Sequence, residues 1–285
     1  METGAIPIGS LDGGLDLQAT LESGQTYLWD RADGRMYEDD HVHGGSAWYE
    51  TVAPPLPGVG NDRAVVRCRQ ANGRLEWEAT TDAVPILTHL LRLDDDLDAI
   101  RAATPDLPVL DRAFERYRGM RLVRDPPFGA LISFICSAQM RVARIHGMQT
   151  ALADAFGEPV AAGDDGPTHR AYPTPEALAA ATEADLRELG LGYRAPYVRE
   201  SARMVAEGEA DPLAARDRPY EAAREYLTRF VGVGEKVADC VLLFSLDHLG
   251  AVPLDTWIRT AIADHFPDCD RGGYAETSRA IREVS

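Results

Sequence analysis

This sequence of 285 residues is nearly without lysine. Lysine and arginine together number 29, and every one of them except Lys236 is arginine. An arginine guanidinium stays protonated in proteins, whereas a lysine amine can lose its proton when desolvated and then act as a nucleophile. The retained Lys236 is therefore a candidate for covalent chemistry, although a chain that has lost its lysines can also keep one by chance.

Long apolar runs and paired cysteines are also absent. No run reaches the ~18 residues of a membrane span, and the N-terminus lacks a signal pattern, so we expect a cytoplasmic protein without a membrane partner. The cysteines Cys68, Cys136, Cys240 and Cys269 form no Cys-x-x-Cys pair. This spacing predicts neither a zinc site nor an iron–sulfur cluster, and we expect no metal and no cofactor.

Positive charge is scarce, because 46 acidic side chains face 29 basic ones and the formal net charge is −17. That balance alone argues against nucleic-acid binding, which usually shows as a basic patch. The replacement of lysine by arginine and the abundant aspartate favour another cause, a halophilic adaptation to high internal salt. Salt weakens binding to phosphates, so a DNA-binding protein there would depend on stacking, wedging and backbone donors. The net charge therefore does not decide the partner.

The hydrophobic pattern changes once along the chain, at about residue 83. Before that point, strand patterns separated by turn residues occur at 25–29, 47–52, 64–68 and 75–79. After it the apolar period is helical, with helices expected at 83–91, from 97 onward, and at 107–117, 128–156 with a break at 137–141, 175–189, 193–206, 256–266 and 274–284; a loop is expected at 161–173. We predict an α+β fold with an antiparallel sheet domain at 1–82 packed on a mostly helical domain at 83–285.

A Val-Gly-Val-Gly turn at 231–234 joins two amphipathic segments, which predicts a helix-hairpin-helix at about 221–247. Backbone N–H groups at the start of the second helix, with the helix dipole, suit a phosphate oxygen. Gly232 and Gly234 would let a nucleic-acid backbone approach without a Cβ in the way. A plain helical turn in a core could carry the same glycines, but the matched helices favour a phosphate-binding hairpin.

Three residues around this hairpin carry candidate chemistry. Lys236 falls on the first turn of the second helix, Cys240 follows one turn later on the same face, and Asp255 precedes the next helical pattern. Asp255 can cap that helix, face the amine, or do both. An amine and a carboxylate suit cleavage of an N-glycosidic bond, because the amine attacks C1′ while the carboxylate stabilises positive charge on the sugar.

These residues, with several separate blocks, resemble the 8-oxoguanine DNA glycosylase family of the helix-hairpin-helix glycosylase/lyase superfamily. The blocks stand in the order typical of the family, at 15–17, 23–25, 29, 119–124, 133–137, 143–145, 189–195 and 232–240. The resemblance implies a TBP-like N-terminal sheet. It also implies a bifunctional DNA glycosylase and DNA-(apurinic or apyrimidinic site) lyase of base excision repair. We expect it to act as a monomer on double-stranded DNA with 8-oxoguanine opposite cytosine.

The resemblance implies roles for single residues. Lys236 would form a Schiff base with the sugar and permit β-elimination, and Asp255 would assist both steps. The carbonyl of Gly24 would accept the N7–H that only the oxidised base carries, and Cys240 would lie against the flipped base. Seven residues would hold the DNA, with Tyr193 wedged into the duplex and Arg144 and Arg194 on the orphaned cytosine; the seven are Gln139, Arg144, Tyr193, Arg194, Gly232, Gly234 and Val237.

The sequence departs from the family pattern at three places. Gln139, Met140 and Arg141 stand where eukaryotic members have asparagines, and Trp257 stands where the family has a histidine. The last helix of the family, with a Gln and a Phe that complete the base pocket, has no counterpart before Ser285, so we expect either a truncated chain or a pocket that is closed differently. Two other interpretations stay open: a glycosylase for alkylated bases, which generally uses the aspartate without the lysine, and a non-catalytic DNA-binding remnant.

Overall fold

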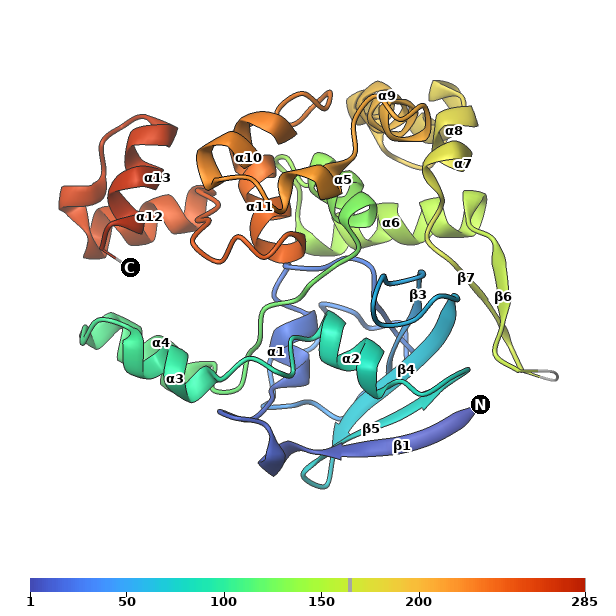
Figure 1. The fold of residues 1–285 in the computed structure, drawn as a ribbon, viewed down its shortest axis with the longest axis horizontal. Helices are drawn as coiled ribbons and strands as arrows, with labels where there is room; N and C mark the ends of the chain where they lie inside the picture. Colours follow the sequence, from blue (N-terminus) through green and yellow to red (C-terminus); the bar gives the residue numbers. More distant parts are fainter. Residues whose placement is uncertain (164–165, 285) are drawn as a thin grey trace.

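The N-terminal part of the chain is an antiparallel sheet, which lies beneath a helical body in the computed structural model (Figure 1). The structure describes residues 1–163 and 166–284. The sheet has five strands in the order β1-β5-β4-β3-β2, and the apolar sides of α1 and α2 share its core. The bounds are β1 (Glu2–Pro7), α1 (Leu17–Leu21), β2 (Asp30–Arg31), β3 (Tyr49–Ala53), β4 (Ala64–Ala71), β5 (Arg74–Ala79) and α2 (Val84–Leu90).

The sequence pattern located three of these strands. Positions 47–52, 64–68 and 75–79 fall on β3, β4 and β5. Asn72 and Gly73 form the β4–β5 turn with φ of 52° and 72°, which is the left-handed geometry of a two-residue hairpin. The register places Ala71 opposite Arg74.

The strand predicted at 25–29 is wrong. The Gln25 side chain donates to the carbonyl of Thr20 at 3.1 Å and to that of Arg121 at 2.9 Å, so the segment is an irregular link between sheet and helices. Periodicity also missed β1, which pairs with β5, and α1. All five residues of α1 are buried, and a helix without an exposed face shows no amphipathic pattern.

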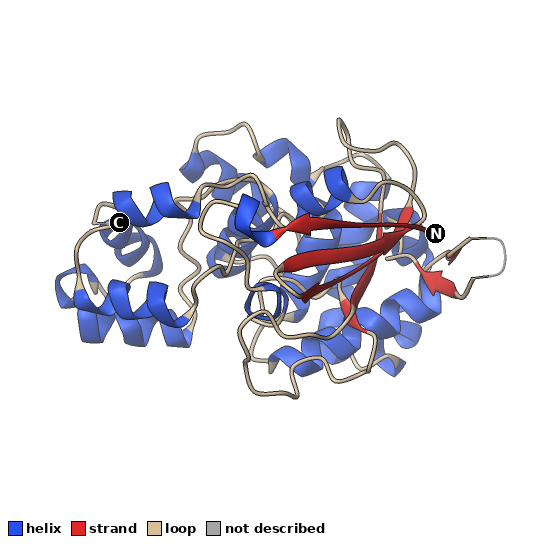
Figure 2. Cartoon of the chain, turned by 90° about the horizontal axis from the view of Figure 1, so that it is seen from below, coloured by secondary structure: helices blue, strands red, loops and turns tan. Residues whose placement is uncertain are grey.

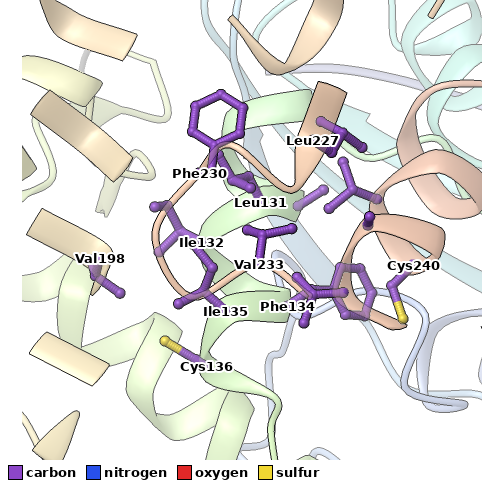
Figure 3. Packing of buried hydrophobic residues seen from close by; sticks show 14 of the residues in the cluster. Leu131, Ile132, Phe134, Ile135, Cys136, Val198, Leu227, Phe230, Val233 and Cys240 are labelled. Carbon is purple, nitrogen blue, oxygen red and sulfur yellow. The ribbon is translucent and has the colours of Figure 1, made fainter. Parts of the chain in front are cut away.

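The helical body is built around α5 (Pro127–Cys136), in which every residue from Gly129 to Cys136 is buried. Figure 3 shows its apolar side chains among those of the hairpin, with Phe134 from α5 and Val233 from the turn in one cluster. The other helices are α3 (Leu97–Ala103), α4 (Pro108–Arg116), α6 (Val142–Phe156), α7 (Pro175–Ala180), α8 (Glu183–Glu188), α9 (Ala195–Ala206), α10 (Tyr220–Leu227), α11 (Glu235–Ser245), α12 (Thr256–His265) and α13 (Tyr274–Arg282). Short 3-10 turns occur at η1 (Ile8–Ser10), η2 (Gly192–Arg194), η3 (Pro212–Ala215) and η4 (Pro267–Cys269).

The helix predicted at 175–189 is two helices. Thr182 caps α8 by accepting from the Asp185 N–H at 3.1 Å, while the Asp185 carboxylate accepts from the Thr182 N–H at 3.0 Å. This capping box begins a new helix and ends α7. Within the loop predicted at 161–173, β6 (Pro159–Ala161) pairs with β7 (Thr168–Arg170), and residues 164 and 165 lie outside the described part.

The last two helices form a small unit of their own. Leu254, Ile262, Cys269 and Ile281 make a core that is separate from the larger core of the helical body. In Figures 1 and 2 this unit lies at the end of the molecule opposite the β6–β7 hairpin. Among the described helices, none is both long enough and apolar enough to cross a membrane.

Candidate active site

The predicted hairpin is formed by α10, the turn and α11. Phe230, Val233, Val237 and Val241 are buried, which packs the two helices together. Gly232 has a φ of 86°, and a Cβ there would lie 2.9 Å from the Cβ of Tyr197. Both the backbone conformation and the close approach therefore require glycine at 232.

The first turn of α11 leaves backbone donors free. Gly234 is the N-cap and provides no side-chain cap. The N–H groups of Glu235, Lys236 and Val237 make no hydrogen bond within residues 1–163 and 166–284. A Cβ on Gly234 would meet nothing within 4 Å. Free N–H donors at a helix N-terminus, with open space above Gly234, suit the binding of a phosphate.

Lys236 is half-buried, and its amine is held by the end of α5. Nζ donates to Oγ of Ser137 at 3.1 Å, and it lies 5.8 Å from the ring centre of Phe134. The Ser137 hydroxyl in turn donates to the Phe134 carbonyl at 2.7 Å, so its lone pair is left to accept from the amine. Ser137 lies inside one of the matching blocks, but no local pattern indicates that it contacts the lysine.

Cys240 lies one turn beyond Lys236 and is buried. Burial raises the pKa of its thiol to about 12, and the nearby Lys236 opposes part of that rise. The group is therefore a neutral thiol at physiological pH, which packs as a small apolar surface.

Gly24 lies in the irregular link before β2, on the other side of this site. Its φ is 83°, and a Cβ there would lie 3.1 Å from Cγ1 of Val142 and 3.4 Å from the hydroxyl of Tyr27. The Tyr27 ring meets the Phe134 ring edge to face at 6.0 Å. Since Phe134 also underlies Lys236, one aromatic contact joins the Gly24 segment to the hairpin.

Asp255 is the N-cap of α12, and its Oδ1 accepts from the Ile258 N–H at 2.8 Å. The same side chain acts on the site. Burial raises the pKa of the Tyr27 phenol well above its ordinary value, and the negative charge of Asp255 raises it further. The carboxylate thus lies in the electrostatic neighbourhood of Tyr27 and Cys240 while it caps its helix.

The remaining predicted residues surround the 137–141 loop and η2. Arg194 is buried, donates to the Ala138 carbonyl, and lies 4.3 Å from the ring centre of the exposed Tyr193. Arg144 is exposed beside Gly190, where a Cβ would lie 3.2 Å from its Nη2. Gln139 is exposed with a left-handed φ of 55°.

Two family models together cover nearly the whole chain. Residues 8–131 match the 8-oxoguanine DNA glycosylase N-terminal domain, and residues 132–284 match the HhH-GPD superfamily base excision DNA repair protein. The chain belongs to the 8-oxoguanine DNA glycosylase family. The match confirms the resemblance and the α+β fold with a helix-hairpin-helix.

Named relatives agree with this family. The chain is 40% identical over 267 residues to the N-glycosylase/DNA lyase of Saccharomyces cerevisiae, covering 86% of this chain and 66% of that protein. It is 31% identical over 276 residues to the probable N-glycosylase/DNA lyase of Methanothermobacter thermautotrophicus, covering 89% of this chain and 82% of that one. It spans 64% of the Arabidopsis thaliana relative named N-glycosylase/DNA lyase OGG1.

A solved structure has the same fold. The 8-oxoguanine glycosylase/lyase of Clostridium acetobutylicum, in complex with double-stranded DNA containing cytosine opposite 8-oxoguanine, has a TM-score of 0.79 at 24% identity. The match covers 94% of this chain and 86% of that one. Among the described residues no group of three or more His, Cys, Asp or Glu side chains could hold a metal ion.

One departure from the family pattern is visible on the surface. Trp257, which replaces the family histidine, is 81% exposed at the start of α12. It lies two residues after Asp255, on the open side of the α12–α13 unit. The indole there offers a face for stacking and one N–H donor, but not the acceptor nitrogen of an imidazole.

Proposed function

We propose that this protein is a bifunctional DNA glycosylase and abasic-site lyase that excises 8-oxoguanine in base excision repair. The observation that carries the proposal is the placement of the only lysine. Lys236 stands on the first turn of the hairpin's second helix, beside free backbone donors, one turn from Cys240 and over the ring that supports the Gly24 segment.

In the proposed reaction the hairpin N–H groups hold a phosphate of the lesion strand. Tyr193 fills the gap that the flipped nucleotide leaves, and Arg144 and Arg194 contact the cytosine. These contacts depend little on positive surface charge, which is consistent with binding at high salt.

The chemical steps follow from one amine and one carboxylate. Nζ of Lys236 attacks C1′, the C1′–N9 bond breaks, and the base leaves with the bonding electrons and takes up a proton. The sugar ring then opens to a Schiff base with Lys236, loss of a 2′-hydrogen follows, and the 3′-phosphate is eliminated. Asp255 stabilises the positive charge that develops on the sugar.

Selection of the oxidised base would rest on Gly24 and Cys240. The carbonyl of Gly24 would accept a hydrogen bond from the N7–H of 8-oxoguanine, whereas guanine has a lone pair at that atom. The neutral Cys240 thiol would pack against one face of the base. Gly24 has a left-handed φ of 83°, which residues with a side chain rarely adopt, so this position favours glycine.

Borohydride trapping on an 8-oxoguanine:cytosine duplex in high salt tests the proposal. The wild-type protein should give a covalent adduct, and Lys236→Gln should give none. Lys236→Arg is the matched control, because it keeps the positive charge and removes the nucleophile. An undiminished adduct in either variant rules out Lys236 as the nucleophile.

A substrate panel separates this function from its alternatives. Two Bacillus subtilis relatives, 29% and 23% identical, are named putative DNA-3-methyladenine glycosylase YfjP and DNA-3-methyladenine glycosylase. Release of 3-methyladenine without trapping would favour an alkylated-base enzyme, and DNA binding without release of any base would favour a non-catalytic module. Retention of one lysine at the hairpin argues for the 8-oxoguanine reaction.

We further propose that the protein works in the cytoplasm as a monomer on double-stranded DNA. The chemistry described needs only side chains and backbone donors. The division into a sheet domain at 1–82 and a glycosylase domain at 83–285 also stays a proposal, which separate expression of the two parts would test.

A further inference from the structure

The carboxylate of the proposed pair belongs to a unit that is joined to the nucleophile's helix largely by polar contacts. Asp255 caps α12, and α12 and α13 pack in a core separate from the one around α11. Side-chain hydrogen bonds nevertheless join α13 to the two hairpin helices. The distance between Asp255 and Lys236 therefore depends on how those bonds hold the unit.

One of these contacts ends at Asp239, a fully buried residue of α11. One carboxylate oxygen accepts from the Tyr220 hydroxyl of α10 at 2.6 Å, and the other accepts from the Tyr274 hydroxyl of α13 at 2.8 Å. Arg224 lies 4.0 Å away. A buried carboxylate is costly unless it is hydrogen-bonded, so both hydroxyls are held firmly in place.

Tyr274 continues the connection to the catalytic carboxylate. Its oxygen accepts from the backbone N–H of Leu254 at 3.1 Å. Its proton is already given to Asp239, so the lone pair is the group that can meet this N–H. Leu254 is the residue immediately before Asp255, and Asp239 is three residues after Lys236 on the same helix. A chain of two hydrogen bonds thus runs from the lysine helix to the aspartate.

We propose that Asp239 is a positioning residue that, through Tyr274, fixes the Asp255 carboxylate relative to the Lys236 amine. The inference rests on the proposed function, because it concerns the geometry of that pair. Tyr220 binds the same carboxylate and also reaches Ser278 of α13 at 3.3 Å, but the bond to Leu254, beside Asp255, is made by Tyr274. Removing either hydroxyl deletes the same group, and only the Tyr274 hydroxyl contacts the backbone next to Asp255.

Paired substitutions test this difference. Tyr274→Phe removes one hydroxyl and should lower the single-turnover excision rate by about 10- to 100-fold, since an error of about 1 Å in a reacting geometry can cost that much. Tyr220→Phe, the matched control, should lower it by no more than about 5-fold, the factor equivalent to one net hydrogen bond of about 1 kcal/mol. Affinity for an uncleavable abasic-site duplex should be unchanged in both.

Two results would overturn the proposal. One is an equal loss of rate in the two variants, and the other is a loss that follows DNA affinity or thermal stability instead of the chemical step. Asp239→Asn compared with Asp239→Ala adds a rescue: the amide keeps an acceptor and should retain more of the rate. If the wild-type protein itself excises no base, the proposed function fails, and the variants have no wild-type rate to be compared with.

A second readout needs no enzymatic activity. Because Lys236 is the only lysine, reductive methylation with a 13C label gives one lysine signal besides that of the N-terminus. The chemical shift of the Lys236 signal should change when Asp255→Asn is introduced into the wild-type protein. It should change much less when Asp255→Asn is introduced into the Tyr274→Phe variant. The Tyr220→Phe background should preserve the full movement. Equal movement in all three backgrounds would contradict the positioning role.

Discussion

The Nζ atom of Lys236 and the Oγ atom of Ser137, 99 positions apart in the sequence, lie 3.1 Å from each other. Ser137 is the C-cap of α5, the most deeply buried helix of the body. The amine is therefore held by the rigid centre of the fold, although its own helix end is open to the surface. This contact orients the amine, and it leads to the first prediction.

Ser137→Ala should slow formation of the borohydride-trapped adduct by about 3- to 10-fold, because loss of a hydrogen bond costs roughly 0.5 to 1.5 kcal/mol. DNA affinity should stay the same, since Ser137 contacts the amine and not the hairpin donors. Ser137→Thr keeps the hydroxyl and should keep most of the rate. A full rate in Ser137→Ala would mean that the contact does not orient the amine.

Gly24→Ala should lower the rate of 8-oxoguanine excision by more than its lowered stability explains. The variant places a Cβ 3.1 Å from Val142 at a φ of 83°, and the left-handed conformation costs about 1–2 kcal/mol. Gly34 has a φ of 73° with nothing within 4 Å, so Gly34→Ala is the matched control. Both variants should lower the unfolding midpoint, and only Gly24→Ala should lower the excision rate.

The two glycines of the hairpin should separate binding from folding. A Cβ at Gly234 meets nothing within 4 Å, whereas one at Gly232 lies 2.9 Å from the Cβ of Tyr197. Gly234→Ala should keep the melting temperature and weaken duplex binding roughly 10-fold, because the methyl group keeps a phosphate from the free donors. Gly232→Ala should lower both. Unchanged duplex binding in Gly234→Ala would show that the phosphate does not approach there.

Asp125 predicts a pH dependence of stability. Burial raises the pKa of its carboxyl to about 7, and a hydrogen bond from Thr26 opposes part of the rise. The folded state thus binds this proton more tightly than the unfolded state. The protonated Asp125 therefore stabilises the fold at low pH, and this part of the free energy of unfolding is lost as pH rises from about 4 through 7.

Asp125→Asn should remove that dependence. Its Oδ1 can still accept from Thr26, which donates at 2.9 Å in the wild type. Denaturant unfolding at pH 5 and pH 8 should show a variant that gains stability relative to the wild type as pH rises. The other carboxyl groups titrate in both proteins, so their effects on the free energy of unfolding cancel when the variant is compared with the wild type. A constant difference between the two pH values would contradict the raised pKa.

The sequence predicted the parts of the fold whose causes are local. The Asn72-Gly73 turn fixes the β4–β5 hairpin, and the Gly-x-Gly turn between amphipathic segments fixes the helix-hairpin-helix. The sequence pattern did not predict the segments whose conformation depends on contacts with distant parts of the chain. The 25–29 segment has strand composition, yet the Gln25 amide bonds across to Arg121, and β1 exists only because β5 lies beside it.

The candidate site shows the same division. Lys236 and Asp255 could be proposed from a residue count, a turn and a spacing. Their partners were not, because the contacts of Ser137 with Lys236 and of Tyr274 with Asp239 join residues far apart in the sequence. Nothing in the local pattern distinguishes Tyr274 from any other tyrosine on an amphipathic helix.

The most direct test of the account is to map the covalent adduct in the wild-type protein. After borohydride reduction on 8-oxoguanine:cytosine DNA and proteolysis, mass spectrometry should place the sugar remnant on the peptide that contains Lys236. Because this chain has no other lysine, the only competing amine is the N-terminus of Met1. A remnant on Lys236 alone is the predicted result, and a remnant on Met1, or excision with no trapped amine, would contradict the central claim.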